Sequence, residues 1–164
     1  MTLSSDLKMA NHCVQACNTA NRTLGMIKRT IQFRDPATLL QLYKSLVRPH
    51  LEYCSPVWSP YYVKDKQLIE KVQHRFTKLF PDLSGMSYMD RLDSLGLWTL
   101  EERRNRTDLI EVFKMMKGIS SVSPERFFVT STVGSTRGHS LKLVKPQCEG
   151  LTRQNFFSVR VINR

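Results

Sequence analysis

The sequence lacks the short motifs that mark most enzyme active sites. It has no pair of adjacent aspartates, no glycine-rich phosphate loop, and none of the patterns G-x-S-x-G, H-E-x-x-H or C-x-x-C. The adjacent acids Glu101 and Glu102 fall at the expected start of a helix, where the helix macrodipole stabilises negative charge. We therefore expect no catalytic residue in this chain, no cofactor and no small-molecule substrate.

Acidic residues and long apolar runs are also scarce. The 164 residues include 25 Lys+Arg but only 14 Asp+Glu, which gives a net charge of +11 at pH 7. This excess favours polyanionic partners, with nucleic acid first and an anionic membrane surface second. No run approaches the roughly 20 apolar residues that cross a bilayer, and no secretory signal is visible. We expect an intracellular protein without a membrane partner, and the choice between nucleus and cytoplasm stays open.

Cysteine is limited to four residues, and in a reducing compartment these are expected to be free thiols. Cys13 and Cys17 are four residues apart, as are His50 and Cys54, so each pair could present two zinc ligands on one helix face. However, Cys13 and Cys17 fall on the apolar stripe of the first expected helix, where a small thiol packs well. We favour packing over a zinc site and expect no metal.

Apolar residues recur at helical spacing through most of the first 120 residues. The pattern predicts a mainly α fold, a bundle of about five helices over residues 7–31, 36–49, 64–80, 87–95 and 100–117. Pro49 should kink or end the second helix, Ser87 and Thr99 should start capping boxes, and Gly96 and Gly118 should act as C-caps. We expect a helical domain over 1–120, and a basic, partly irregular extension over 121–164 with a short strand at 140–144 and a terminal helix.

Basic residues form stripes on these helices. Lys64, Lys71, Arg75 and Lys78 share one side of the third helix, opposite its apolar face, and they lack matching Glu residues at i+4. Such a stripe is either a solvated surface or a surface that contacts phosphates without reading bases. The candidate nucleic-acid-binding residues are Lys28, Arg29, Lys64, Lys71, Arg75, Lys78, Arg103, Arg104, Arg137 and His139.

A proline-punctuated segment around Trp58 carries further aromatic residues, Tyr61 and Tyr62. These rings could stack on bases or sugars. We expect instead that they pack a rigid loop onto the helices, because large aromatic side chains usually bury much of their area.

The run 42–58, LYKSLVRPHLEYCSPVW, resembles a signature of reverse transcriptases from non-LTR retrotransposons of the LINE type (jockey- and CR1-like), in the segment downstream of the polymerase palm. The resemblance extends over nearly the whole chain, and its further motifs are SSDLK at 4–8, LGMIKR at 24–29, EKVQHR at 70–75, LGL at 95–97, LEERR at 100–104, DLIEVFK at 108–114 and TRGH at 136–139.

The resemblance implies a thumb and post-thumb region, which would hold the template–primer duplex as it leaves the palm. In that family the catalytic aspartates lie upstream, in a motif that this sequence does not contain. We therefore expect a C-terminal fragment of an RNA-directed DNA polymerase that binds RNA–DNA or double-stranded nucleic acid but polymerises nothing. The alternative is an interaction fragment whose helices expose an apolar face toward the missing palm or another protein. The burial of Val14, Leu24, Leu42 and Leu46 separates the two interpretations.

Overall fold

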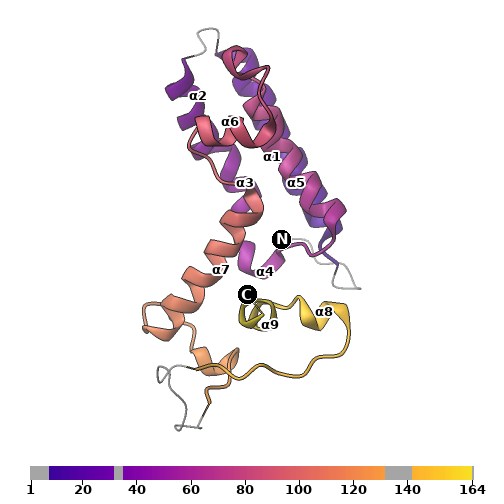
Figure 1. Cartoon of the computed structure of the whole chain (residues 1–164), viewed down its shortest axis with the longest axis vertical. Coiled ribbons are helices and arrows are strands. Elements are labelled where there is room, and N and C mark those ends of the chain that lie inside the picture. Colours follow the sequence, from indigo (N-terminus) through magenta and orange to yellow (C-terminus); the bar gives the residue numbers. More distant parts are fainter. Residues whose placement is uncertain (1–7, 32–34, 132–141, 164) are drawn as a thin grey trace. The chain divides into compact units, whose positions relative to one another are not determined.

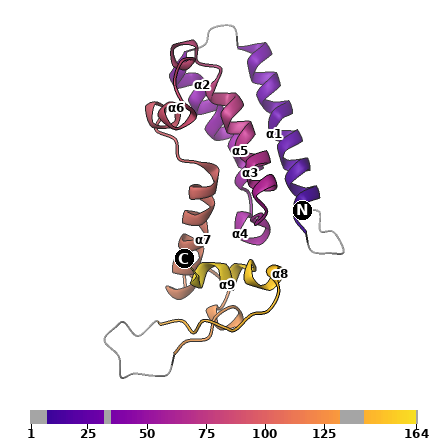
Figure 2. The same ribbon diagram turned by 45° about the vertical axis from the view of Figure 1, so that its right-hand side comes forward.

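The computed structural model describes residues 8–31, 35–131 and 142–163 of the chain. These residues are mainly helical, as the sequence predicts (Figures 1 and 2). They divide into two compact units, unit 1 (Met1–Arg104) and unit 2 (Asn105–Arg164). The domain boundary expected after residue 120 therefore falls inside unit 2.

Two parallel helices, α1 (Ala10–Thr30) and α5 (Val63–Thr77), form the centre of unit 1. One face of α1 is buried along its whole length, from Cys13 to Ile27. The Cys17 thiol lies 3.6 Å from the carbonyl oxygen of Leu68, and the Arg75 guanidinium donates to the Asn21 side-chain oxygen at 3.0 Å. Residue numbers rise together in these two pairs, so the helices run in the same direction.

The second helical run contains a π-helical turn. It consists of α2 (Pro36–Leu42), the π segment η1 (Tyr43–Val47) and α3 (Arg48–Glu52). Asp35 caps α2 as expected, because its carboxylate accepts the Thr38 N–H at 2.8 Å. At the end of the π segment, the Arg48 N–H donates to the Tyr43 carbonyl, five residues earlier. This wider turn directly precedes Pro49, whose ring would collide with a carbonyl in a regular α-helix, so Pro49 interrupts the helix without ending it.

The segment around Trp58 is helical where the sequence predicted a loop. Ser55–Trp58 form one turn, α4, with Pro56 near its start, where a missing N–H costs nothing. Trp58 is 1% exposed, and its indole N–H donates to the Tyr53 carbonyl at 2.5 Å. The expectation that Trp58 packs onto the helices is therefore confirmed.

N-cap side chains start the next two helices, and the second of them forms a full capping box. The Ser87 hydroxyl accepts the Asp90 N–H at the start of α6 (Tyr88–Ser94). At the start of α7 (Leu100–Met116), the Thr99 hydroxyl accepts the Glu102 N–H, and the Glu102 carboxylate accepts the Thr99 N–H in return. A 3-10 turn, η2 (Pro81–Leu83), precedes α6. Gly96 and Gly118 have φ values of 59° and 66°, which confirms their role at helix ends.

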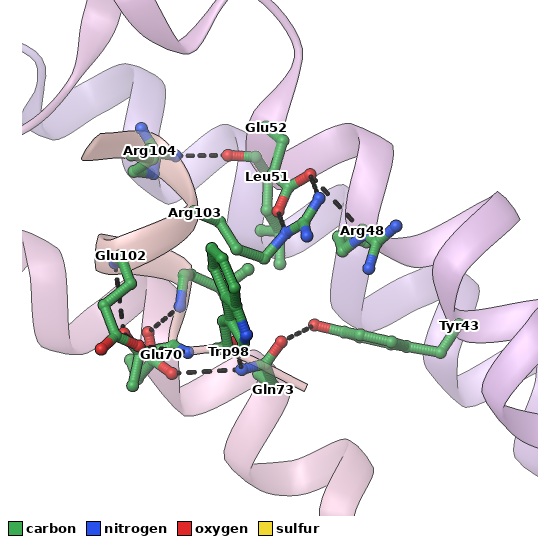
Figure 3. Close-up of polar contacts among 12 residues, drawn as sticks. Tyr43, Arg48, Leu51, Glu52, Glu70, Gln73, Trp98, Glu102, Arg103 and Arg104 are labelled. Atoms are coloured by element: carbon green, nitrogen blue, oxygen red, sulfur yellow. Dashed lines mark hydrogen bonds and ion pairs between the residues drawn. The ribbon is translucent and has the colours of Figure 1, made fainter. Parts of the chain in front are cut away.

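A buried amide joins the elements of unit 1. Gln73 of α5 is fully buried, and its side-chain oxygen accepts the Tyr43 hydroxyl at 2.7 Å (Figure 3). Its amide nitrogen donates to the Trp98 carbonyl at 3.0 Å and to the Tyr88 hydroxyl at 3.2 Å. The Tyr43 ring also stacks on Phe76, with centroids 4.1 Å apart. One side chain thus connects α5 to η1, α6 and the segment before α7.

Unit 2 has a separate small core. Its shorter elements are η3 (Pro124–Arg126), α8 (Leu151–Gln154) and α9 (Phe157–Ile162), so the expected terminal helix is present. Asp108 of α7 is fully buried and accepts two hydrogen bonds of 2.9 Å from the Arg160 guanidinium of α9. In place of the expected strand at 140–144, residues 142–144 make only an isolated antiparallel bridge between Leu143 and Thr130, and residues 140–141 lie outside the described residues.

Replacement of Tyr43 by Phe should lower the free energy of unfolding by about 1–3 kcal/mol, because the buried Gln73 oxygen loses its hydroxyl donor. Urea denaturation followed by far-UV circular dichroism measures this change. Tyr53→Phe is the matched control, because Tyr53 is 78% exposed and should change the stability by less than about 0.5 kcal/mol. Equal stability of the two variants would contradict the role given to the Tyr43–Gln73 hydrogen bond.

Candidate nucleic-acid interface

The outer side of α5 carries the basic stripe that the sequence predicts. Lys64, Lys71 and Arg75 are exposed within α5, and Lys78 is exposed at its C-cap. Residues 64, 71 and 78 are seven apart, which is about two helical turns, so their side chains leave the helix on the same side. The opposite side of α5 lies in the core of unit 1.

The last turn of α1 adds two more exposed cations, Lys28 and Arg29. Because α1 and α5 are parallel neighbours, the C-terminal ends of both helices lie at the same end of unit 1 (Figure 2). We define the α1/α5 basic surface by six residues: Lys28, Arg29, Lys64, Lys71, Arg75 and Lys78.

Sequence reasoning missed a further exposed cation beside the α1/α5 basic surface. Arg22 of α1 is exposed and follows Asn21, the residue that accepts a hydrogen bond from Arg75. Arg22 precedes Arg29 by seven residues and therefore shares its side of α1. This seven-residue spacing is the sequence feature from which Arg22 could have been predicted.

Carboxylates do not pair with the six residues of the α1/α5 basic surface within the described ranges. Arg75 donates to the Asn21 amide, and the Lys64 ammonium lies 5.7 Å from the centre of the Tyr62 ring. The ion pairs of the described residues involve other cations: Arg48 and Arg103 with Glu52, Lys66 with Glu101, Lys114 with Glu111, and Arg160 with Asp108. The charge of the surface is therefore available to solvent and to an anionic ligand.

The electrostatics at the end of α5 agree with a positive potential. The pKa of His74 is lowered, first by burial and then by the nearby charges of Arg91 and Lys78. A ring nitrogen of His74 lies 3.1 Å from the Arg91 guanidinium, a contact that suits a neutral ring. Cations at a helix C-terminus also stabilise the helix by about 0.3–1 kcal/mol each. The same residues can therefore stabilise the helix ends and attract a polyanion.

Arg104 does not belong to this surface, contrary to the sequence-based expectation. It is 4% exposed, and its guanidinium lies 4.1 Å above the Trp58 ring. It also donates to the Leu51 carbonyl (Figure 3). A phosphate cannot reach a side chain buried in this way. The apolar neighbours on the other elements of unit 1 decide this placement, and the pattern of α7 alone does not reveal them.

Arg103 is only partly exposed, and a carboxylate already occupies its guanidinium. Both carboxylate oxygens of Glu52 accept hydrogen bonds from Arg103, one of them at 3.0 Å (Figure 3). This pairing raises the pKa of Arg103. Arg103 therefore serves the contact between α3 and α7 within unit 1. Arg137 and His139, the remaining candidates, lie outside the described residues.

Glu70 is the one carboxylate of α5 that resembles a catalytic group, because burial raises its pKa. Its oxygens accept hydrogen bonds from the Tyr88 hydroxyl, the Gln73 amide at 3.3 Å and the Leu100 N–H at 3.0 Å (Figure 3). The Leu100 N–H is one of the free donors at the start of α7, and Glu70 satisfies it. These contacts make Glu70 a structural residue that holds α7 to α5.

The Cys13/Cys17 and His50/Cys54 pairs are not gathered into a possible metal-binding group in the part of the chain that the structure describes. Among the described residues, no three His, Cys, Asp or Glu side chains are grouped so that they could hold a metal ion. Cys13 and Cys17 are buried in the core of unit 1, whereas Cys54 is exposed. Burial raises the pKa of the Cys13 thiol to about 12 and that of Cys17 to about 11. The packing interpretation of Cys13 and Cys17 is confirmed.

Comparison with models of known protein families, with curated proteins and with solved structures gives no match to this chain. Within the described ranges, none of the helices combines the length and the apolar character required to cross a bilayer.

The thiols should differ sharply in reactivity at pH 8. In the folded protein, Ellman's reagent should label Cys54 rapidly and the half-buried Cys148 more slowly, while Cys13 and Cys17 react only after addition of denaturant. A variant with Cys54→Ser and Cys148→Ser isolates the two buried thiols. Labelling of this folded variant at the rate of Cys54 in the unmodified chain would show that Cys13 or Cys17 is accessible.

Proposed function

We propose that the chain is the C-terminal, post-palm part of a non-LTR retrotransposon reverse transcriptase and that it binds the template–primer duplex without sequence preference. The resemblance of residues 42–58 and of the flanking motifs supports the family. The observation that carries the binding proposal is the α1/α5 basic surface, whose six cations are exposed and have no carboxylate partner among the described residues.

The physical basis of this binding is the release of counterions. Each phosphate that a Lys or Arg neutralises releases condensed cations from the duplex, so the affinity falls steeply as salt rises. Side chains that project from the outside of a helix pair, such as Lys71 and Arg75, can reach the backbone of a duplex but present no fixed pattern to base edges. The proposal therefore includes no sequence specificity.

The proposal does not include polymerisation by this chain alone. The catalytic aspartates of the family belong to the palm, and the sequence has no adjacent pair of aspartates. The palm would supply the metal-binding carboxylates, and this chain would supply positive charge along the duplex.

A charge-reversal variant of α5 tests the binding proposal. Fluorescence anisotropy of a labelled RNA–DNA duplex should show binding at low salt, with a slope of log K against log salt of about −0.9 for each phosphate neutralised. In the variant Lys71→Glu, Arg75→Glu, Lys78→Glu, the affinity should fall at least tenfold. The slope should also flatten by about 0.9 for each phosphate that the variant no longer neutralises.

The matched control reverses three exposed cations of unit 2: Lys114→Glu, Lys117→Glu and Arg126→Glu. Both triple variants lose the same net charge, so equal losses of affinity would mean that total charge matters and the α1/α5 basic surface does not. Absence of any binding by the unmodified chain at low salt would remove the proposed function altogether.

A second candidate function, association with protein, is favoured by a specific observation on α7. Leu109, Ile110 and Phe113 are 52%, 41% and 56% exposed, and they share one side of this helix. In unit 1, Leu24 is buried and Leu42 packs against the core, but Val14 and Leu46 are 46% and 42% exposed. Two of these four residues therefore support a self-contained module, and two support an interaction fragment. Exposed apolar surface of this kind favours association with protein.

Analytical ultracentrifugation tests this second function. If the exposed face of α7 associates, the unmodified chain should form concentration-dependent oligomers, and the variant Leu109→Glu, Phe113→Glu should sediment as a monomer. The matched control Val57→Glu, Val63→Glu changes two equally exposed apolar residues of unit 1 and should leave the oligomers intact. A strictly monomeric unmodified chain would contradict self-association through α7.

A further inference from the structure

A groove in unit 1 lies between α1 and α3 and has a volume of about 420 Å³. Its polar lining consists of His12, Gln15 and Thr19 from α1, His50 from α3 and Tyr53 from the end of α3. Ala16 and Pro49 complete it with aliphatic surface. The volume lies in the lower part of the range of small-ligand sites. Carboxylates and ammonium groups are absent from this lining.

Tyr53 is the most exposed large apolar or aromatic side chain of the described residues, at 78%. Its backbone is nevertheless fixed on both sides. The Tyr53 N–H donates to the Pro49 carbonyl at 2.9 Å, and its carbonyl accepts the indole N–H of the buried Trp58. The ring is therefore presented to solvent at the rim of the groove from a rigid support. An exposed aromatic ring of this kind is what a base stacks on.

The other lining groups suit the edge of a base. His12 is held edge-on against the Trp58 ring, with centroids 4.6 Å apart. Burial, and to a smaller extent the charge of Arg104, lowers the pKa of His12, which favours the neutral ring. The Thr19 hydroxyl donates to the Gln15 carbonyl at 3.1 Å, and its oxygen can still accept a hydrogen bond. A polar lining without Lys, Arg, Asp or Glu suits a neutral heterocycle better than a free phosphate.

Helix α1, which lines one side of the groove, also carries residues of the α1/α5 basic surface. Residues 15, 19, 22 and 29 of α1 follow one another at intervals of four, three and seven, so the groove side of the helix continues through Thr19 to Arg22 and Arg29. Arg22 lies about 4.5 Å further along the helix axis than Thr19. A strand whose base enters the groove would therefore bring its backbone phosphates to Arg22.

From this arrangement we infer that the groove between α1 and α3 binds an unpaired nucleobase, stacked on Tyr53, at a single-stranded end of the bound nucleic acid. This inference deepens the proposed function and rests on it, since the α1/α5 basic surface supplies the affinity for the strand. The α1/α5 basic surface contacts the phosphates of the duplex, and Tyr53 stacks on the ring of the overhanging base.

Three labelled probes test the inference with the full chain: a blunt RNA–DNA duplex, the same duplex with a short thymidine overhang, and the same duplex with an overhang of equal length made of abasic residues. The abasic overhang adds the same phosphates without bases, so the ratio of the two overhang affinities isolates stacking. The thymidine overhang should bind about fivefold or more tightly than the abasic one.

Tyr53→Ala should reduce this ratio to about one without changing the affinity for the blunt duplex, and Tyr53→Phe should preserve it, because the ring remains. Phe156→Ala is the matched control, since Phe156 is an exposed aromatic residue that does not line the groove, and it should leave the ratio unchanged. Circular dichroism checks that each variant is folded. Equal affinity of the unmodified chain for both overhangs, or an unchanged ratio in Tyr53→Ala, overturns the inference.

The blunt duplex separates the failure of the inference from the failure of the proposed function. Binding of the blunt duplex with equal overhang affinities would overturn only the base-binding groove. Absence of blunt-duplex binding, together with Tyr53-dependent binding of the thymidine overhang, would remove the duplex function and support the groove. Absence of binding to every probe overturns both.

Discussion

The buried amide of Gln73 is the constraint on which the geometry of unit 1 depends. A fully buried amide must satisfy its donors and its acceptor inside the protein, because leaving one unpaired costs about 1–3 kcal/mol. Gln73 does so through Tyr43, Tyr88 and the Trp98 carbonyl, which come from three different parts of the chain. Meeting this requirement fixes α5 relative to η1 and α6. The outer side of α5, with its basic stripe, is fixed by the same contacts.

The basic residues that give the chain its net charge of +11 have two different structural roles. Arg91, Arg104 and Arg160 are buried or nearly so and hold carbonyls, hydroxyls and a carboxylate inside their own units. Lys28, Arg29 and the four α5 residues remain at the surface without carboxylate partners among the described residues. Arginine suits the internal role because its planar, weakly hydrated guanidinium can be buried with several acceptors. Only the exposed group is relevant to a polyanionic partner.

The chain has two further candidate binding surfaces that do not depend on its positive charge. They are the groove between α1 and α3 and the exposed face of α7. The groove offers an aromatic ring and polar side chains, whereas the α7 face offers apolar side chains. Nucleic acid would bind in the groove, and a protein partner would bind to the exposed face of α7. The two proposed functions therefore involve different residues, and the variants Tyr53→Ala and Leu109→Glu, Phe113→Glu can separate them.

Local sequence patterns determined most of the helices, the starts of α2, α6 and α7, and several helix ends. The Thr99–Glu102 capping box, the Asp35 cap and the terminal glycines Gly96 and Gly118 act within a few residues of chain, so their effect can be predicted without tertiary structure. The stripe on α5 was predictable for the same reason, because helical periodicity alone separates its exposed side from its buried side.

Tertiary structure alone decided which basic residues stay at the surface and where a groove forms. Arg104 and Arg106 both lie in the first half of α7, yet Arg104 is buried over Trp58, a residue 46 positions earlier in the sequence, while Arg106 is exposed. Tyr53 and His12 line one groove although 41 residues separate them. Burial and concavity depend on contacts between segments distant along the chain, and local periodicity carries no information about which segments meet.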